Sequence, residues 1–260
     1  MSAPLLNVDK VTICFGGLTA VSGLDLQIGA RELVGLIGPN GAGKTTVFNL
    51  ITGVYQPTEG TIKFGDKPTS QMQPHQLTKL GIARTFQNIR LFASMSVFDN
   101  VRAAVQVHRD HGIRNALWRG QAFCDGEQAV AVTVMELLEI FGLGQFRNEE
   151  AKSLPYGNQR RLEIVRALAT RPKLLLLDEP AAGMNPTEKV ELTKLIRFIK
   201  EKFQIAVLLV EHDMQVVMDL SDRVYVLNFG CLIAEGTPQE VARHPEVLKA
   251  YLGGEEAGNA

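Results

Sequence analysis

A glycine-rich segment that ends in a lysine and a threonine is the part of this chain best suited to chemistry. The pattern G-x-x-x-x-G-K-[ST] is fitted by Gly38-Pro39-Asn40-Gly41-Ala42-Gly43-Lys44-Thr45, and Thr46 follows. In this pattern the glycines let successive backbone N–H groups face one anion, and the lysine reaches the β- and γ-phosphates. The Thr45 hydroxyl is suited to Mg²⁺. The segment therefore predicts a site for a nucleoside triphosphate with magnesium, and the alternative is a glycine-rich turn without a ligand.

A pair of carboxylates after a second apolar run could complete such a site. Asp178 and Glu179 follow the run 174–177, which has the length and composition of a buried strand. Open α/β sheets bind ligands at the carboxyl ends of their strands. We expect Asp178 to support Mg²⁺ through water and Glu179 to orient or deprotonate the attacking water. The alternative is an exposed acidic turn.

The surrounding elements predict an α/β fold of the P-loop NTPase type. An apolar strand over 33–37 precedes the glycine-rich segment and a helix over 45–52 follows it, ended by Gly53. A second α/β pattern follows the acidic pair, with a helix over 188–203 and a strand over 206–210. We also expect an antiparallel layer from strands at 11–15, 24–28 and 61–64, a helix over 129–141, and a hairpin from 224–227 and 232–234.

Composition narrows the class of protein. The chain has 260 residues, 45% of them hydrophobic, and a formal net charge of −1, so it can bury a large core and is a poor candidate for binding nucleic acid. No run is long and apolar enough to cross a bilayer, and no signal peptide is visible. The three cysteines are far apart and suggest neither a disulfide framework nor a zinc site. Arg160 and Arg161, spaced with Glu163 and Arg166, are expected on a solvated or ion-paired helix face, and the alternative is a phosphate-binding stripe.

Further motifs in order along the chain resemble those of the ATP-hydrolysing subunits of ATP-binding-cassette (ABC) transporters. Thr85-Phe86-Gln87 resembles the family's glutamine loop and Glu211-His212-Asp213 its histidine switch. The family signature falls at Leu154-Pro155-Tyr156-Gly157-Asn158, ahead of a helix expected from about 158 to 170. The resemblance implies an ATPase that uses ATP and Mg²⁺ and works as a dimer, in which one subunit's signature acts on the partner's ATP.

The resemblance also assigns roles to single residues. Glu179, His212 and Gln87 are implied to be catalytic, with His212 contacting a phosphate or Glu179. Thr45, Gln87 and Asp178 are implied to serve Mg²⁺, and residues 38–46 to bind ATP. Phe15 resembles the family's adenine-stacking aromatic residue, although a core phenylalanine is nearly as good an interpretation. Taken alone, Gln87 would be read as a surface residue and His212 as a structural one.

The signature departs from the common form of the family. Pro155 and Tyr156 stand where most members have serine and glycine, and Asn158 replaces glutamine. Because Pro155 offers neither a hydroxyl nor an N–H group, one phosphate contact is missing, and the helix start with Gly157 remains. Asn185 replaces the family's usual aspartate and keeps hydrogen bonding without the charge.

A narrower resemblance is to the ATPases of branched-chain amino-acid importers. It is carried by five segments and by a long insert at about 105–127. The segments are Leu154-Pro155-Tyr156-Gly157, Arg160-Arg161-Leu162-Glu163-Ile164, Glu179-Pro180-Ala181-Ala182-Gly183 with Asn185-Pro186, Val210-Glu211-His212-Asp213-Met214 and Ala250-Tyr251-Leu252-Gly253. It implies a nucleotide-binding core with an antiparallel β subdomain over 1–87 and 166–260, and a helical subdomain with the signature over 88–165.

The implied partners are transmembrane permeases, a second ATPase of the same or a sister chain and, indirectly, a substrate-binding protein. The implied place is the cytoplasmic side of the inner membrane. We expect residues 87–96 to contact the permease, although the apolar run 91–95 fits core packing equally well. Cassettes for urea or amide uptake and for lipid or polysaccharide export remain alternatives, and the transported substrate does not follow from these residues.

Overall fold

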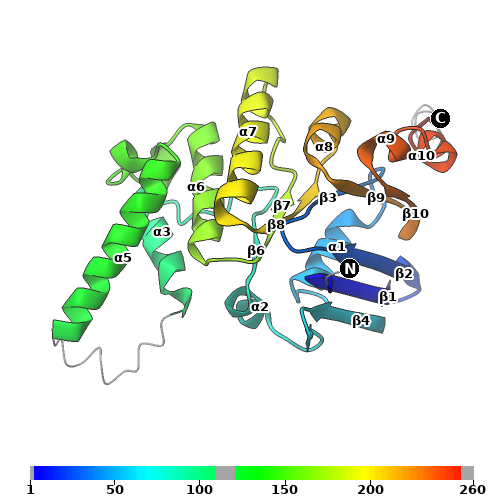
Figure 1. Cartoon of the computed structure of the whole chain (residues 1–260), viewed down its shortest axis with the longest axis horizontal. Coiled ribbons are helices and arrows are strands. Elements are labelled where there is room, and N and C mark those ends of the chain that lie inside the picture. Colours follow the sequence, from blue (N-terminus) through cyan, green and yellow to red (C-terminus); the bar gives the residue numbers. More distant parts are fainter. Residues whose placement is uncertain (1–2, 109–120, 253–260) are drawn as a thin grey trace. The chain divides into compact units, whose positions relative to one another are not determined.

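In its computed structural model the protein is described over residues 3–108 and 121–252, and these residues form two compact units (Figure 1). The first unit consists of residues 1–77 and 173–260, and the second of residues 78–172. The sequence suggested a division at 87/88 and 165/166, whereas the compact units divide at 77/78 and 172/173. Residues 78–87 and 166–172 therefore belong to the second unit. The tail at 253–260 and much of the insert at 105–127 lie outside the described residues.

A largely parallel sheet forms the centre of the first unit. Its strands are β3 (Leu33–Ile37), β7 (Leu174–Asp178), β8 (Ala206–Val210), β9 (Arg223–Asn228) and β10 (Cys231–Gly236). Their order is β10-β9-β3-β8-β7, and of these strands β10 alone runs antiparallel to its neighbour. Every residue of β3, β7 and β8 is buried, as expected for strands covered on both faces. The predicted parallel core and the hairpin of β9 and β10 are confirmed.

A second, antiparallel sheet in the same unit has the order β2-β1-β4-β5. Its strands are β1 (Leu6–Phe15), β2 (Leu18–Ile28), β4 (Glu59–Phe64) and β5 (Lys67–Pro68). Leu6, Val8, Val11 and Ile13 of β1 are buried. The antiparallel layer is thus confirmed, but β1 and β2 are longer than the sequence pattern predicted.

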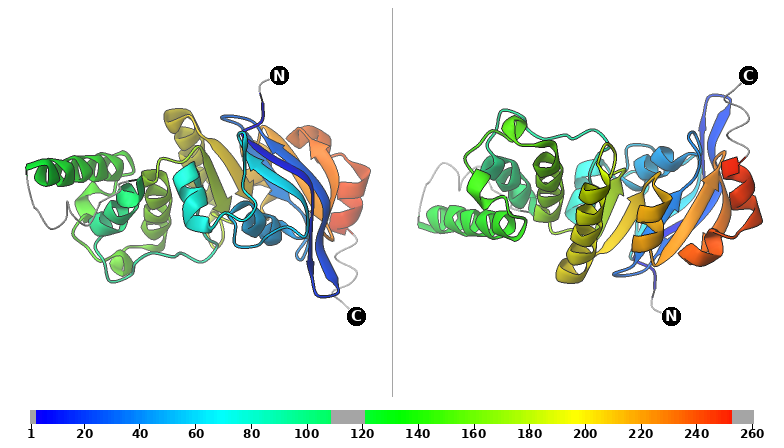
Figure 2. Two further views of the ribbon diagram at one scale, coloured as in Figure 1. Left: turned by 90° about the horizontal axis from the view of Figure 1, so that it is seen from below. Right: turned by 90° about the horizontal axis from the view of Figure 1, so that it is seen from above.

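The helices of the first unit are α1 (Lys44–Ile51), α7 (Pro186–Phe203), α8 (Met214–Leu220), α9 (Pro238–Val241) and α10 (Pro245–Leu252), of which α9 and α10 follow the last strand. Helix α2 (Pro74–Leu80) begins in this unit and ends in the second. Both views of Figure 2 show α9 and α10 beside β9 and β10. Val241 of α9 and Val247 of α10 join one buried apolar cluster with Ile37 of β3. The carboxyl-terminal helices therefore share the core of the strand that precedes the glycine-rich loop.

Helices dominate the second unit, where α3, α5 and α6 pack on one another (Figure 1). Its elements are β6 (Ile82–Arg84), α3 (Val97–Val105), α5 (Gln121–Ile140), α6 (Tyr156–Ala169) and 3₁₀ helices at Gln106–His108, Gly144–Phe146 and Ala151–Ser153. The expected helix over 129–141 is the second part of α5. Within residues 3–108 and 121–252, no helix combines the length and the apolar character needed to span a bilayer.

Candidate active site

Strand register brings three predicted elements to one edge of the parallel sheet. Val210, the last residue of β8, pairs with Leu36 of β3 on one side and with Asp178 of β7 on the other. The glycine-rich loop begins directly after β3, Asp178 is the last residue of β7 with Glu179 next to it, and His212 lies two residues after the end of β8. The structure therefore brings together residues of the chain that are far apart in sequence, at the edge where open α/β sheets bind ligands.

The glycine-rich loop has a backbone that needs glycine at two positions. Gly38 has a φ of 152°, and a Cβ atom there would lie 2.1 Å from the Leu227 carbonyl oxygen. Gly43 has a φ of 100° and would place a Cβ atom 2.8 Å from the Ala20 carbonyl oxygen. Side chains rarely adopt such angles, and neither carbonyl belongs to a flexible side chain. Both glycines therefore fix the shape of the loop, and α1 starts directly after Gly43.

Lys44 is the first residue of α1, and its side chain lies against the loop. Only 5% of the residue is exposed, and Nζ donates hydrogen bonds to the carbonyl oxygens of Gly38 at 2.7 Å and Pro39 at 2.9 Å. Burial lowers the pKa of Lys44, while the negative charges of Glu179 and Asp178 oppose this shift. The ammonium group and both carboxylates thus share one electrostatic environment.

Glu179 has a strained backbone in the left-handed region, with a φ of 46°. Its N–H group donates to the Val210 carbonyl oxygen at 2.8 Å, which fixes the residue to the neighbouring strand β8. Its side chain is almost fully buried, and Oε1 forms a hydrogen bond with His212 Nε2. The structure therefore places His212 on Glu179, one of the two contacts that the sequence suggested for it.

Glu211, which sequence reasoning did not single out, supports the segment after Glu179. It is buried, and its Oε1 accepts a hydrogen bond from the Ala181 N–H group at 2.6 Å. Burial raises the pKa of Glu211, and the hydrogen bond from Ala181 opposes that rise. The only sequence signal for this role is its position, directly after a wholly apolar strand.

Replacement of Glu211 by glutamine is expected to change how stability depends on pH. Because the folded-state pKa is raised above 4.5, the folded chain holds a proton that the unfolded chain releases just above that pH. The free energy of unfolding of the wild type therefore falls as pH rises through this window, whereas the amide of the variant has no proton to lose. Urea midpoints of both proteins between pH 4 and 8 should diverge as pH rises, in favour of Glu211→Gln. A difference that stays constant with pH would contradict the assignment.

The oxygen donors at this edge suit Mg²⁺ held together with a phosphate ligand. Asp178 is buried at the end of β7, and Thr45 is exposed in the first turn of α1. Among the residues that the structure describes, no cluster of His, Cys, Asp and Glu could form an all-protein metal cage. Mg²⁺ usually keeps several waters and takes one or two carboxylates plus substrate phosphates. The donor set therefore fits Mg²⁺ brought in with a nucleotide.

Phe15 is not a core residue, so that alternative interpretation is wrong. It ends β1 with 43% of its surface exposed, and it meets the Tyr55 ring edge-on at 5.0 Å between ring centroids. An exposed aromatic face at this position can stack on a flat ligand. Stacking of Phe15 on adenine stays a prediction.

The second unit holds the remaining predicted residues, beginning with the signature. Helix α6 starts at Tyr156, two residues earlier than the sequence suggested, and Pro155 is its N-cap. No side chain caps this helix start, and Tyr156 is 47% exposed. Gly157 and Asn158 thus lie in the first turn, where N–H groups and the helix dipole favour an anion.

Gln87 also belongs to the second unit, and its backbone is held by Arg160. Gln87 itself is exposed, and its carbonyl oxygen accepts a hydrogen bond from Arg160 at 2.8 Å. Arg160 is not on a solvated helix face, because only 1% of it is exposed; it is ion-paired with Glu163 at 3.0 Å between nitrogen and oxygen. For Arg160 and Glu163 the predicted face is therefore ion-paired and buried.

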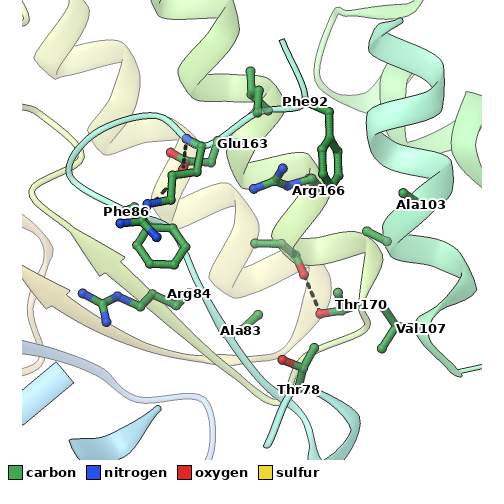
Figure 3. A pocket seen from close by; sticks show the side chains of 14 residues that line it. Thr78, Ala83, Arg84, Phe86, Phe92, Ala103, Val107, Glu163, Arg166 and Thr170 are labelled. Atoms are coloured by element: carbon green, nitrogen blue, oxygen red, sulfur yellow. Dashed lines mark hydrogen bonds between the residues drawn. The ribbon is translucent and has the colours of Figure 1, made fainter. Parts of the chain in front are cut away.

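A cavity of about 690 Å³ opens beside this segment in the second unit (Figure 3). Guanidinium groups of Arg84 and Arg90 lie over the Phe86 ring, 5.0 and 4.2 Å from its centroid. Arg166 lies over the Phe92 ring at 5.4 Å, and Phe92 is 50% exposed. The run 91–95 is therefore not simply core packing, since Phe92 faces a basic and aromatic cavity.

Comparisons with known proteins agree with this geometry. Residues 21–182 match the family described as ABC transporter, and residues 231–257 match the family described as branched-chain amino acid ATP-binding cassette transporter. The high-affinity branched-chain amino acid transport ATP-binding proteins BraF of Pseudomonas aeruginosa and LivG of Escherichia coli K12 are each 44% identical over 97% of this chain and 99% of their own length. The solved ADP conformation of MJ1267, an ATP-binding cassette of an ABC transporter, is 29% identical with a TM-score of 0.83, over 97% of this chain and all of that one.

Proposed function

Because the chain belongs to the family of ABC transporter ATP-binding proteins, we propose that it hydrolyses ATP to power the import of branched-chain amino acids. Relatives at 44–45% identity over nearly the whole chain carry that transport role in their names. The carboxyl-terminal match at 231–257 supports the same branch. Export is the alternative function that a relative represents: the lipopolysaccharide export system ATP-binding protein LptB of Escherichia coli K12 is 32% identical over 95% of this chain, a lower identity than that of BraF and LivG.

One observation carries the ATPase part of the proposal. At the carboxyl edge of the sheet, the charges of Asp178 and Glu179 act on the buried Lys44 ammonium group, and Glu179 forms a hydrogen bond with His212. Phosphoryl transfer needs a cation and a helix N-terminus that bind the phosphates. It also needs one carboxylate that supports magnesium and another that positions the attacking water. Catalysis of this reaction consists mainly of positioning and of stabilising charge.

Each residue has a defined task in the proposed reaction. The N–H groups of residues 41 and 43–46 and the Lys44 ammonium hold the phosphates, whereas the Ala42 N–H group donates to the Pro39 carbonyl oxygen. Glu179 orients the attacking water and accepts its proton. His212 keeps Glu179 in place through their hydrogen bond. Thr45 and Asp178 would hold Mg²⁺, which would neutralise charge on the β- and γ-phosphates. Gln87, which belongs to the second unit, stays a predicted ligand of the same ion.

We extend the proposal to a pair of cassettes in which residues 154–158 of one protomer cover the ATP of the other. The start of α6 supports this, because no side chain of the described residues caps it and the positive end of the helix dipole lies there; the Asn158 N–H group itself donates to the Pro155 carbonyl oxygen at 2.9 Å. Pro155 supplies no donor, so the Gly157 N–H group, the Asn158 side chain and the helix dipole carry the contact. The partner is a second copy or a sister ATPase.

The cavity beside residues 84–92 is the proposed docking site for a permease segment that faces the cytoplasm. Its exposed Phe92 and its arginines favour an apolar segment with an acidic or carbonyl-rich end. Docking at this site would hold the chain at the cytoplasmic face of the inner membrane.

Purification of the tagged chain from its own cell tests the proposal. We expect two permease subunits and an ATPase partner to copurify, and membranes that contain them to take up leucine only with hydrolysable ATP. Phe92→Ala should reduce permease recovery, whereas Phe198→Ala should not. Phe198 is a matched control because it is also exposed and lies under a cation, with Lys202 Nζ at 5.6 Å. Recovery of an export complex, or of no membrane subunit, would refute import.

A further inference from the structure

A buried ion pair lies at the start of the signature helix α6 in the second unit. Arg160 and Glu163 are each 1% exposed, and Arg160 Nη1 lies 3.0 Å from Glu163 Oε2. Burial of two charges is costly unless further hydrogen bonds satisfy both groups. The remaining donors and acceptors of this pair therefore need hydrogen-bond partners inside the second unit.

Most of them are used on the backbone of residues 86–90, and only Arg160 Nε has no hydrogen-bond partner among the described residues. Arg160 donates to the Phe86 carbonyl oxygen at 2.6 Å and to the Gln87 carbonyl oxygen at 2.8 Å. Glu163 Oε1 accepts from the N–H groups of Phe86 at 3.3 Å and Arg90 at 3.2 Å. Figure 3 shows Glu163 facing the loop that carries Phe86. Both members of the pair thus bind the same loop, and Glu163 does so on both sides of Gln87.

The pair also reaches the signature itself. Arg160 Nη2 lies 3.4 Å from the Tyr156 hydroxyl, and its guanidinium lies 6.0 Å from the centroid of the Tyr156 ring. One arginine therefore touches a glutamine-loop carbonyl and a signature side chain at once. All these groups belong to the second unit, so the arrangement is internal to that unit.

We propose that Arg160 and Glu163 are positioning residues that fasten the glutamine loop to the first turn of the signature helix, so that Gln87 and residues 156–158 move as one body. The inference rests on the proposed function for its catalytic readout. In that function Gln87 serves the Mg²⁺ that its own chain binds with ATP, and the signature acts on the partner's ATP. Within one protomer, the pair thereby connects Gln87, which acts on that protomer's own ligand, with the signature residues, which act on the ATP of the partner.

Arg160→Lys is the variant that tests this role, because it keeps the charge beside Glu163. A lysine ammonium lacks the planar fork that serves the two neighbouring carbonyl oxygens together. We expect kcat for ATP hydrolysis to fall roughly 10-fold, the size typical of lost outer-shell support, with KM changed by less than about 2-fold. Arg171→Lys, an exposed arginine just beyond the end of the same helix, should match the wild type.

A double-mutant cycle with Gln87→Ala separates positioning from general stability. If the pair acts through Gln87, Arg160→Lys should change kcat by less than about 2-fold once Gln87 is gone, because residues in one network do not act additively. Full loss in both backgrounds, or no loss in either, would overturn the inference.

Hydrogen exchange supplies a readout that does not depend on ATPase activity. In Glu163→Gln the neutral amide is a weaker acceptor than the carboxylate, so the N–H groups of Phe86 and Arg90 should exchange faster than in the wild type. This variant also serves if Arg160→Lys fails to fold. Unchanged exchange would refute the proposal that Arg160 and Glu163 fasten the loop. A wild type that hydrolyses no ATP would refute the proposed function, and the exchange result would still be valid.

Discussion

Glu179→Gln is expected to lower the rate of ATP hydrolysis by about 10²–10⁴-fold while ATP still binds. Glutamine has nearly the same shape and can keep the hydrogen bond to His212 Nε2, so the left-handed turn at residue 179 should persist. What is lost is the group that accepts a proton from water. Because Lys44 and the loop are untouched, affinity for ATP should stay close to that of the wild type.

Phosphate release in steady state and calorimetric titration with ATP and Mg²⁺ measure the two expectations separately. Glu201→Gln is the matched control, since that glutamate is exposed near the end of α7 and its replacement should leave turnover unchanged. If Glu179→Gln hydrolyses ATP at nearly the wild-type rate, Glu179 is not the base. If it fails to bind ATP, the change has disturbed the loop and another replacement is needed at that residue.

Local sequence patterns were enough where a single segment decides both structure and chemistry. The strand 33–37 and the strand 206–210 were predicted at their observed bounds, because a wholly apolar run between turn residues has few other uses. The loop shape follows from its glycines, two of which are required by backbone angle and close contact. The shared carboxyl edge follows from parallel pairing, once both apolar runs are read as strands.

Strand lengths were missed where the alternation of buried residues changes phase. In β1 the buried positions shift between Val8 and Val11, where the pairing register with β2 also shifts and Lys10 has a φ of 46°. In β2 Gly23 has a φ of 56° before Leu24. Such bulges insert an extra residue, so a strict two-residue period detects only the part of the strand on one side.

The roles of buried charges could not be predicted from the sequence. Arg160 and Glu163 look like members of an exposed charged helix, because their burial depends on carbonyl and N–H groups more than seventy residues earlier in the chain. Glu211 is similar, since its partner Ala181 lies thirty residues away. Charge patterns within a helix carry no information about such distant partners.

Lys44→Met is expected to lower kcat/KM for ATP by about 10²–10³-fold, and unlike Glu179→Gln it should also weaken ATP binding. Methionine keeps the length and the burial of the side chain but removes the only charge that this residue brings to the loop carbonyls of Gly38 and Pro39. It also leaves Asp178 and Glu179 without the cation whose pKa they influence, so an incoming triphosphate meets uncompensated negative charge.

The control for this effect is Lys63→Met, an exposed lysine of β4 in the antiparallel sheet. The melting temperatures of both variants without nucleotide should lie close to the wild type, because the loop keeps its backbone bond from Ala42 to Pro39 and its glycine geometry. Stabilisation by ATP follows the concentration of ligand divided by Kd, so it should disappear in Lys44→Met alone. A Lys44→Met chain that ATP stabilises as strongly as the wild type would show that the loop binds its ligand through backbone N–H groups without the lysine. The phosphate contact would then have to be reassigned to the helix start and the glycines.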